Sequence, residues 1–287
     1  MKAILLDGPL GTELAGRGVP TPLPRWSADA LLNAPDAVRA IHADYAAAGA
    51  QVHTANTFRT RAATLGEAWS ELAALAVRLA REACGPGARV AGSIAPLEDC
   101  YRPDASPADR EPSATRAEHA RLSGVLAAAG CDLLLCESFP HVGEGWLALE
   151  AAVETGLESW CSFTPGWDAS LLTPAAVADG ARGAIERGAA AVLVNCLPIP
   201  RALDYARALA EAASAGGVPF GCYANAGVPD ERVGWASSPP AVERYAAAAG
   251  TWLEEGASIV GGCCGTGPAH VAALAGILGR REEGPAT

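Results

Sequence analysis

The chain has 287 residues, half of them hydrophobic, and a formal net charge of −11 at pH 7. This length allows a large core and one or two domains. Lys and Arg are nowhere concentrated, and no apolar run approaches the roughly 18 residues of a membrane span, so we expect neither nucleic acid nor a membrane as a partner. The first apolar stretch stops at Asp7, which predicts a cytoplasmic protein without a signal peptide.

Short apolar runs alternate along the chain with alanine-rich segments of helical period. The predicted strands are 3–6, 51–55, 89–94, 132–137, 158–163, 190–195, 219–223 and 258–261. The predicted helices lie near 35–48, 68–83, 115–129, 144–155, 174–187, 200–214, 239–248 and 268–279. Start signals are a capping box of Thr115 with Glu118, and the N-cap pairs Thr173-Pro174 and Ser238-Pro239.

Eight strand–helix units of about 36 residues predict an α/β fold, a single-domain (β/α)8 TIM barrel spanning residues 1–287. A doubly wound open sheet is the alternative, but it normally has fewer strands, and no Gly-rich dinucleotide fingerprint follows the first strand. The longest loops, near 16–34, 97–113, 164–172 and 225–238, all follow strands, where a barrel has its catalytic face.

Two adjacent cysteines, Cys263 and Cys264, follow the eighth predicted strand in the sequence GGCCG, and Cys196 ends the sixth. A disulfide between sequence neighbours is strained, and the Cys-x-x-Cys spacing of redox pairs is absent. A core role suits one of the two better than both, because consecutive strand side chains point to opposite faces. In a barrel the ends of the sixth and eighth strands border one mouth, so three thiolates could meet there and hold zinc with one position open.

A zinc ion with three thiolate ligands is a poor Lewis acid for hydrolysis, because the site is electron-rich. It can still bind an incoming thiol as a thiolate near neutral pH. Such a thiolate remains nucleophilic, which favours attack on an electrophilic methyl group. The expected nucleophile is therefore the zinc-activated thiolate of a substrate, with no separate protein nucleophile.

Seven segments in order carry a resemblance to a known family: LLDGPLGTEL (5–14), HTANTF (53–58), GSIAP (92–96), DLLLCESFP (132–140), VLVNC (192–196), YANAG (223–227) and GGCCGTGPAHV (261–271). The chain resembles the homocysteine S-methyltransferases, zinc-dependent barrel enzymes related to betaine- and S-methylmethionine-dependent enzymes and to the homocysteine domain of methionine synthase. The resemblance implies that Cys196, Cys263 and Cys264 bind Zn²⁺, and that Asp7 and Glu137 bind the amino group of homocysteine.

Further residues are candidates for substrate contacts. The turn from Gly8 to Thr12 could offer backbone N–H groups to the substrate carboxylate, and Ser138 adjoins Glu137. Three asparagines at strand ends, Asn56, Asn195 and Asn225, fit either substrate contacts or turn caps. Among the histidines, His141 follows the ESFP segment in a mouth loop and is the candidate for a functional role. We expect partly solvated helix positions for His42, His119 and His270.

The sequence thus predicts methyl transfer from a small sulfonium donor, S-methylmethionine or S-adenosylmethionine, to homocysteine. An aromatic wall suits such a cation, and Trp26, Trp167 and Trp235 lie in the mouth loops, although they could also be ordinary loop anchors. A betaine-type donor is a rival whose carboxylate needs a cationic anchor, and the loops offer scattered arginines, Arg25, Arg102 and Arg232. A selenol acceptor, selenohomocysteine or selenocysteine, is a second rival, and a zinc- or thiol-binding protein without turnover is a third.

Overall fold

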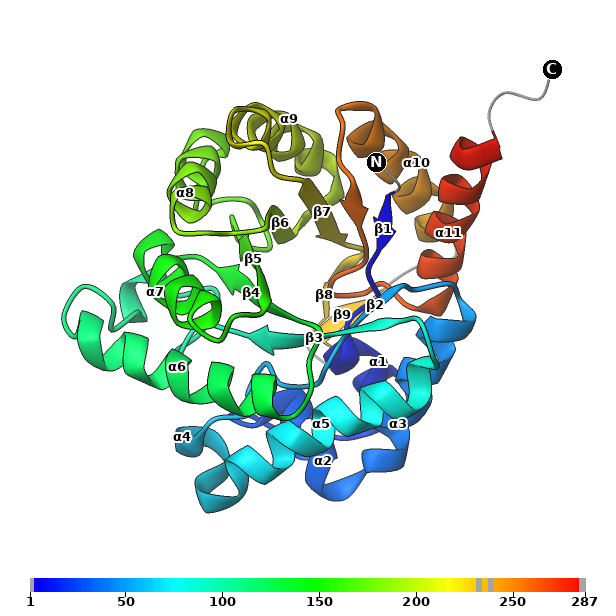
Figure 1. The fold of residues 1–287 in the computed structure, drawn as a ribbon. Helices are drawn as coiled ribbons and strands as arrows, with labels where there is room; N and C mark the ends of the chain where they lie inside the picture. Colours follow the sequence, from blue (N-terminus) through cyan, green and yellow to red (C-terminus); the bar gives the residue numbers. More distant parts are fainter. Residues whose placement is uncertain (1–2, 231–233, 237–239, 284–287) are drawn as a thin grey trace.

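The computed structural model describes residues 3–230, 234–236 and 240–283, and its central feature is a closed parallel barrel (Figure 1). The barrel strands are β1 (Ile4–Leu5), β2 (Val52–Thr54), β3 (Arg89–Ile94), β4 (Leu133–Phe139), β5 (Glu158–Phe163), β6 (Ala191–Pro198), β7 (Phe220–Asn225) and β10 (Ile259–Val260). Each of them overlaps one of the eight predicted strands, so the predicted (β/α)8 barrel is confirmed.

The ring order is β1-β10-β7-β6-β5-β4-β3-β2, with parallel pairing between neighbours. A parallel bridge between Leu6 and Val52 joins β1 to β2 and closes the ring. One strand, β7, separates β6 from β10, as expected for the strands that precede the cysteines. The residues after these strands therefore meet at one end of the barrel.

Helices surround the strands (Figure 1). The α-helices are α1 (Leu10–Gly16), α2 (Asp29–Asn33), α3 (Pro35–Ala47), α4 (Ala62–Leu65), α5 (Trp69–Cys84), α6 (Pro112–Ala128), α7 (Val142–Val153), α8 (Pro174–Glu186), α9 (Ile199–Gly216), α10 (Pro240–Glu254) and α11 (Pro268–Glu283). Short 3-10 turns are η1 (Trp26–Ala28), η2 (Gly66–Ala68) and η3 (Pro103–Ala105). None of the helices in the described residues is long and apolar enough to cross a membrane.

The barrel interior is packed and ends at the cysteines. Its buried side chains come from alternate strand positions, and they are Leu6, Val52, Ala91, Leu133, Leu135, Trp160, Ala191, Leu193 and Ile259. Cys196, Tyr223, Cys263 and Cys264 belong to the same cluster. Each large apolar side chain buried here stabilises the fold by about 1.5–3 kcal/mol. The thiols therefore pack on a well-stabilised barrel core.

Several local predictions are settled by the helix ends. Thr173 caps α8 as predicted, since its side chain accepts a hydrogen bond from the Ala176 N–H at 3.1 Å. The predicted capping box at Thr115 is wrong, because α6 begins earlier, at Pro112, and the Thr115 hydroxyl donates to the Glu111 carbonyl. The predicted Ser238-Pro239 cap lies outside the described residues.

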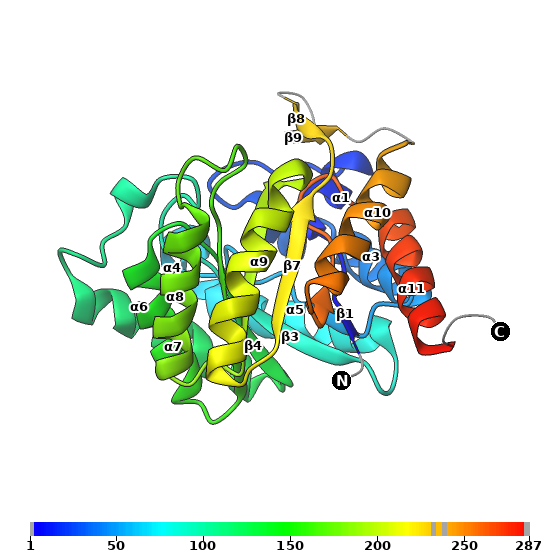
Figure 2. The same cartoon turned by 90° about the horizontal axis from the view of Figure 1, so that it is seen from above.

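Two predicted loop regions contain regular structure. The turn predicted over residues 8–12 is the start of α1, which begins at Leu10 after the N-cap Pro9. The loop predicted over 225–238 includes the antiparallel pair β8 (Val228–Asp230) and β9 (Gly234–Ala236). Figure 2 shows this pair at the end of the barrel opposite the N-terminus, which is the end where the cysteine-bearing strands finish.

Candidate active site

A cavity of about 740 Å³ lies at the carboxyl ends of the barrel strands. Residues predicted for the site that line it are Asp7, Gly8, Thr12, Asn56, Glu137, Ser138, Cys196, Cys263 and Cys264. The volume falls within the range of about 300–1,000 Å³ that is usual for small-molecule pockets. The cavity therefore has room for two small substrates side by side.

The three cysteines converge on the floor of this cavity. The sulfurs of Cys196, Cys263 and Cys264 all lie within 4.8 Å of one another, and those of Cys196 and Cys263 are 2.7 Å apart. All three residues are buried, with 6 to 8% of their surface exposed. With Zn–S bonds of about 2.3 Å, tetrahedral ligation separates two sulfurs by about 3.8 Å, so this cluster has the dimensions to close on one ion.

The backbone conformation at Cys196 and Ser138 directs the Cys196 thiol into the cavity. Cys196 has a φ of 55° and Ser138 a φ of 63°, a conformation uncommon for residues other than glycine. Both occur where the pairing register of their strands shifts, between Asn195 and Pro198 in β6 and between Cys136 and Phe139 in β4. Bulges of this kind redirect side chains at the rims of barrels.

Asn195 joins the two bulges. Its Oδ1 accepts hydrogen bonds from the Ser138 N–H at 3.1 Å and the Ser162 hydroxyl at 2.8 Å, and its Nδ2 donates to Ser138 Oγ at 2.6 Å. The Ser138 hydroxyl in turn faces Cys196 Sγ at 3.9 Å. Asn195 thus uses both its amide oxygen and its amide nitrogen to hold Ser138 and the β6 end in place.

Glycines around Cys263 and Cys264 allow the chain to fold tightly. A Cβ on Gly262 would lie 2.1 Å from Thr266 Oγ1, and one on Gly261 would lie 2.5 Å from Leu6 Cβ. The hydrogen bonds from Cys263 N–H to the Ala224 carbonyl and from Ala226 N–H to the Cys264 carbonyl tie this turn to the end of β7. The GGCC segment therefore presents two adjacent thiols on one side because its glycines permit backbone contacts that side chains would block.

The pKa values of the three thiols are strongly raised. The pKa values of Cys196 and Cys264 are raised well above the usual value for cysteine. The largest cause is a hydrogen bond with a neighbouring thiol, and burial raises both values further. Three thiolates packed this closely without a counter-charge are unfavourable. A soft divalent cation would remove that penalty, and it is the kind of ion that a set of three sulfur donors selects.

Two buried carboxylates lie in the same cavity. Glu137 accepts hydrogen bonds from the Ser93 hydroxyl at 2.5 Å and the Tyr223 hydroxyl at 3.1 Å, and Asp7 accepts one from the Thr54 N–H at 2.9 Å. Burial raises the pKa of both groups, and the nearby Glu137 charge raises that of Asp7 further. An ammonium group placed between them would relieve both desolvation and repulsion.

Asp7 also faces two buried histidines, His42 on α3 and His53 on β2. Their Nδ1 atoms lie 3.9 and 4.0 Å from Asp7 Oδ2, and neither ring has a hydrogen-bond partner among the described residues. The ligand atoms of Asp7, His42 and His53 lie within 4.8 Å of one another, so they form a second group that could approach a metal ion. Metal bonds of about 2.1 Å would bring ligand atoms to roughly 3.4 Å of one another, which is shorter than the two distances to Asp7 Oδ2. Burial lowers the pKa of His42 to about 3 and that of His53 to about 4, which keeps both rings neutral.

Of the remaining predicted residues, some line the cavity and others only support the fold around it. Asn56 donates to the Ser27 carbonyl at 2.8 Å, and Thr12 Oγ1 accepts from Gly265 N–H at 3.3 Å. Neither Asn195 nor Asn225 is among the described residues that line the cavity. The prediction of partly solvated His42, His119 and His270 is wrong, because all three are buried.

The residues predicted in the mouth loops also differ in whether they reach the cavity. Trp26 lines the cavity, but Trp167 is 47% exposed and does not. The side chain of Trp235 lies outside the described part of the chain. His141 caps α7 by accepting from the Glu144 N–H, and its other ring nitrogen faces Asp109, so its contacts are structural.

The family model described as homocysteine S-methyltransferase matches residues 4–278. This chain belongs to the homocysteine S-methyltransferase family. Homocysteine S-methyltransferase 4 of Zea mays is 32% identical, with 97% of this chain and 90% of that protein covered. Homocysteine S-methyltransferase YbgG of Bacillus subtilis is 31% identical over 95% of this chain and 93% of its own length.

Among solved structures, the metallated form of the Escherichia coli homocysteine methyltransferase MmuM superposes with a TM-score of 0.80. It is 28% identical, and 96% of each chain is covered. A selenocysteine methyltransferase of Astragalus bisulcatus is 28% identical over 96% of this chain and 93% of its own length. The protein is therefore a methyltransferase of a family that acts on small molecules.

In this methyltransferase, the loop after β3 supplies cavity residues that its sequence did not single out. Glu98, Asp99, Cys100 and Tyr101 line the cavity, as do Phe58, Arg59 and Arg61 from the segment after β2. The signal available in the sequence was the length of the loop, because long loops on this face form the site.

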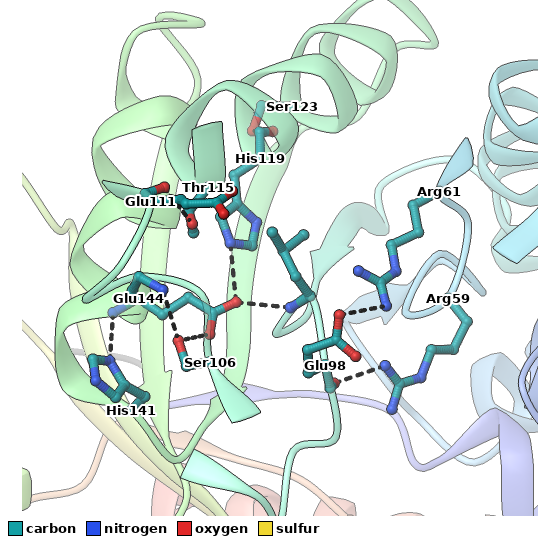
Figure 3. Close-up of polar contacts among 12 residues, drawn as sticks. Arg59, Arg61, Glu98, Ser106, Glu111, Thr115, His119, Ser123, His141 and Glu144 are labelled. Carbon is teal, nitrogen blue, oxygen red and sulfur yellow. Dashed lines mark hydrogen bonds and ion pairs between the residues drawn. The ribbon is translucent and has the colours of Figure 1, made fainter. Parts of the chain in front are cut away.

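Glu144 fastens this loop to the barrel (Figure 3). Its buried carboxylate accepts from the Leu97 N–H at 2.7 Å and the Ser106 hydroxyl at 2.5 Å, and His119 Nε2 lies 3.4 Å away. Burial acts to raise the pKa of Glu144, but the interactions with His119, Ser106 and Leu97 outweigh it and lower that pKa. The carboxylate therefore stays ionised and holds both ends of the segment that brings Tyr101 to the cavity.

Proposed function

We propose that this protein transfers a methyl group from a small sulfonium donor to homocysteine, forming methionine, with zinc held by Cys196, Cys263 and Cys264. The observation that carries the proposal is the convergence of three buried thiols and two buried carboxylates in one cavity. A zinc ion bound to these sulfurs would supply thiol activation, since coordination lowers the pKa of a thiol.

The two carboxylates bind the ammonium group of homocysteine. Asp7 and Glu137 are the acidic groups at the cavity floor, and both carry a pKa raised by burial, which an ammonium partner reverses. Ser93, Tyr223 and the Thr54 N–H hold them in position. Gly8, Thr12, Ser138 and Asn56 line the same space and shape the pocket around the amino acid.

The donor occupies the aromatic side of the cavity. Trp26 and Phe58 form an edge-to-face pair with ring centroids 5.6 Å apart, and Tyr101 lines the wall with them. A sulfonium is stabilised by aromatic faces and leaves as a neutral thioether after losing its methyl group. Proximity and exclusion of water in this buried pocket supply much of the catalysis.

S-methylmethionine is the favoured donor and S-adenosylmethionine the second, because no nucleoside-binding motif stands out in the sequence. Betaine is less activated, since its leaving group is a tertiary amine. A lack of cationic anchors does not count against betaine, however. Arg25 and Arg102 do not line the cavity and Arg232 lies outside the described residues, but Arg59 and Arg61 do line it.

A selenol acceptor is the second candidate, favoured by the similarity to a selenocysteine methyltransferase. The test is turnover of homocysteine and selenocysteine with S-methylmethionine, S-adenosylmethionine and betaine, with zinc measured on the same sample. We expect the highest kcat/KM for homocysteine with S-methylmethionine and about one zinc per chain. Faster methyl transfer to selenocysteine than to homocysteine would make the selenol the acceptor. A kcat/KM for betaine at least tenfold above that for S-methylmethionine would make betaine the donor. Binding of homocysteine without turnover would identify a thiol-binding protein.

A further inference from the structure

Two arginines stand in the cavity wall without a close ion pair among the described residues. Arg59 and Arg61 follow β2, and Arg61 is the N-cap of α4. The side chain of Arg61 is 23% exposed, and its Nε is buried with no hydrogen-bond partner among the described residues. Its nearest carboxylate is Glu98, whose Oε1 lies 4.0 Å from Nη2.

Arg59 is fixed by contacts that do not neutralise it (Figure 3). Its Nη1 donates to the backbone carbonyl of Glu98 at 2.9 Å, and its guanidinium lies 5.3 Å from the centroid of the Phe58 ring. Burial, with the charge of Arg59 acting in the same direction, lowers the pKa of Arg61 against the opposing effect of Glu98. The side chain of Glu98 is itself 55% exposed, so it is a weak partner for Arg61.

The cavity lining as a whole is acidic, with Asp7, Glu98, Asp99 and Glu137, but a partly buried guanidinium without a close carboxylate partner still favours an anionic ligand group. A guanidinium offers paired N–H donors, the arrangement that matches a carboxylate. In the proposed function homocysteine occupies the cavity floor, with its ammonium group on Asp7 and Glu137 and with Gly8 and Thr12 around it. The arginines in the wall are therefore assigned to the other substrate. Aromatic residues for a sulfonium, Phe58 and Tyr101, line the same cavity.

We propose that Arg61, with Arg59 beside it, binds the carboxylate of the methyl donor, and that Glu98 binds the donor's ammonium group. This rests on the proposed function and gives the donor class as a sulfonium that is also an α-amino acid. The subsite sets specificity: it selects donors with a free carboxylate through Arg61, and it favours amino acids over betaine through Glu98.

The experiment compares Arg61→Met with the parent on two donors that differ only in the carboxylate, S-methylmethionine and 3-aminopropyldimethylsulfonium. We expect KM for S-methylmethionine to rise about ten- to hundredfold in Arg61→Met, the range for a lost charge-assisted contact. KM for the decarboxylated donor, KM for homocysteine and the zinc content stay within about twofold of the parent. Arg61→Lys restores part of the lost affinity.

Arg102→Met is the matched control, because Arg102 belongs to the same loop as Glu98 but pairs with Asp104 in solvent. It should leave both donors unaffected. A second arm uses Glu98→Gln with S-methylmethionine and dimethylsulfoniopropionate, which lacks the ammonium group; only the former should bind more weakly.

The inference is overturned if Arg61→Met weakens both donors equally or neither. Calorimetric binding of S-methylmethionine to parent and variant gives the same comparison without turnover. If the parent transfers no methyl group from any donor but binds S-methylmethionine through Arg61, the proposed function fails and the subsite stands. If the parent methylates homocysteine and Arg61→Met is unchanged, the subsite fails and the function stands.

Discussion

Glu137→Gln tests the substrate end of the site with little change in shape. The parent carboxylate is buried and accepts hydrogen bonds from Ser93 and Tyr223, and rotating those hydroxyls satisfies an amide equally well. What is lost is the charge that faces the ammonium group of homocysteine. A charge-assisted contact contributes about 1.5–3 kcal/mol, which corresponds to a ten- to hundredfold weaker Kd.

The assay is isothermal titration of homocysteine into parent and variant, with zinc measured on both. We expect the Kd to rise by that factor while zinc stays bound, because Glu137 is a partner of the ammonium and not of the metal. Glu158→Gln is the control: Glu158 starts β5 and pairs with Arg89 at 2.6 Å near the surface. Unchanged homocysteine affinity in Glu137→Gln would refute the assignment, and loss of zinc would move Glu137 into the metal site.

The substrate-free protein should become more stable in the same variant, since burial raises the pKa of Glu137 and an amide has no charge to desolvate; a lower Tm contradicts this. Cys196→Ser should lose most of its zinc by metal analysis, whereas Cys84→Ser, a half-buried thiol outside the cavity, should keep it; equal zinc in both would exclude Cys196 as a ligand. The histidines facing Asp7 predict acid sensitivity: their folded pKa values, about 3 for His42 and about 4 for His53, lie below the unfolded value of 6.5, so the unfolded state binds more protons and stability falls as pH drops from 6.5. Each contributes about 1.4 kcal/mol per pH unit, and urea unfolding at pH 6.5 and 5 should show a shallower slope for His42→Asn than for the parent; equal slopes would contradict it. Asn195→Ala should lower the free energy of unfolding by about 1–3 kcal/mol, because it leaves the Ser138 N–H unpaired, and should also weaken zinc binding; parental zinc affinity would mean that the β6 bulge holds Cys196 without it.

The barrel was accessible from the sequence because its signals are local. Buried parallel strands read as apolar runs, and the strand over residues 89–94 was predicted with the bounds that β3 has. The convergence of Cys196 with Cys263 and Cys264 followed from ring closure, since it needed only the strand order. Helix starts were less certain: α6 begins at Pro112 because proline at the first position competes with the nearby Thr115 signal.

Contacts between distant segments were not accessible in the same way. Arg61 and Glu98 meet because Glu144, on α7, holds the loop after β3 through Leu97 and Ser106. No local pattern links these positions. His42 and His53 likewise read as ordinary helix and strand residues, and their burial against Asp7 depends on how α3 packs on β2. Asn195 sits at a strand end where a cap and a ligand contact look alike, and only the shift in register distinguishes them.

The central claim is that three thiols hold zinc and that homocysteine joins them through its sulfur. X-ray absorption at the zinc edge, recorded on the purified protein with and without homocysteine, tests it most directly. The account predicts zinc with three sulfur neighbours at about 2.3 Å from Cys196, Cys263 and Cys264, and a fourth sulfur when homocysteine is added. A zinc shell that lacks three sulfurs, or one that does not change with homocysteine, would contradict it.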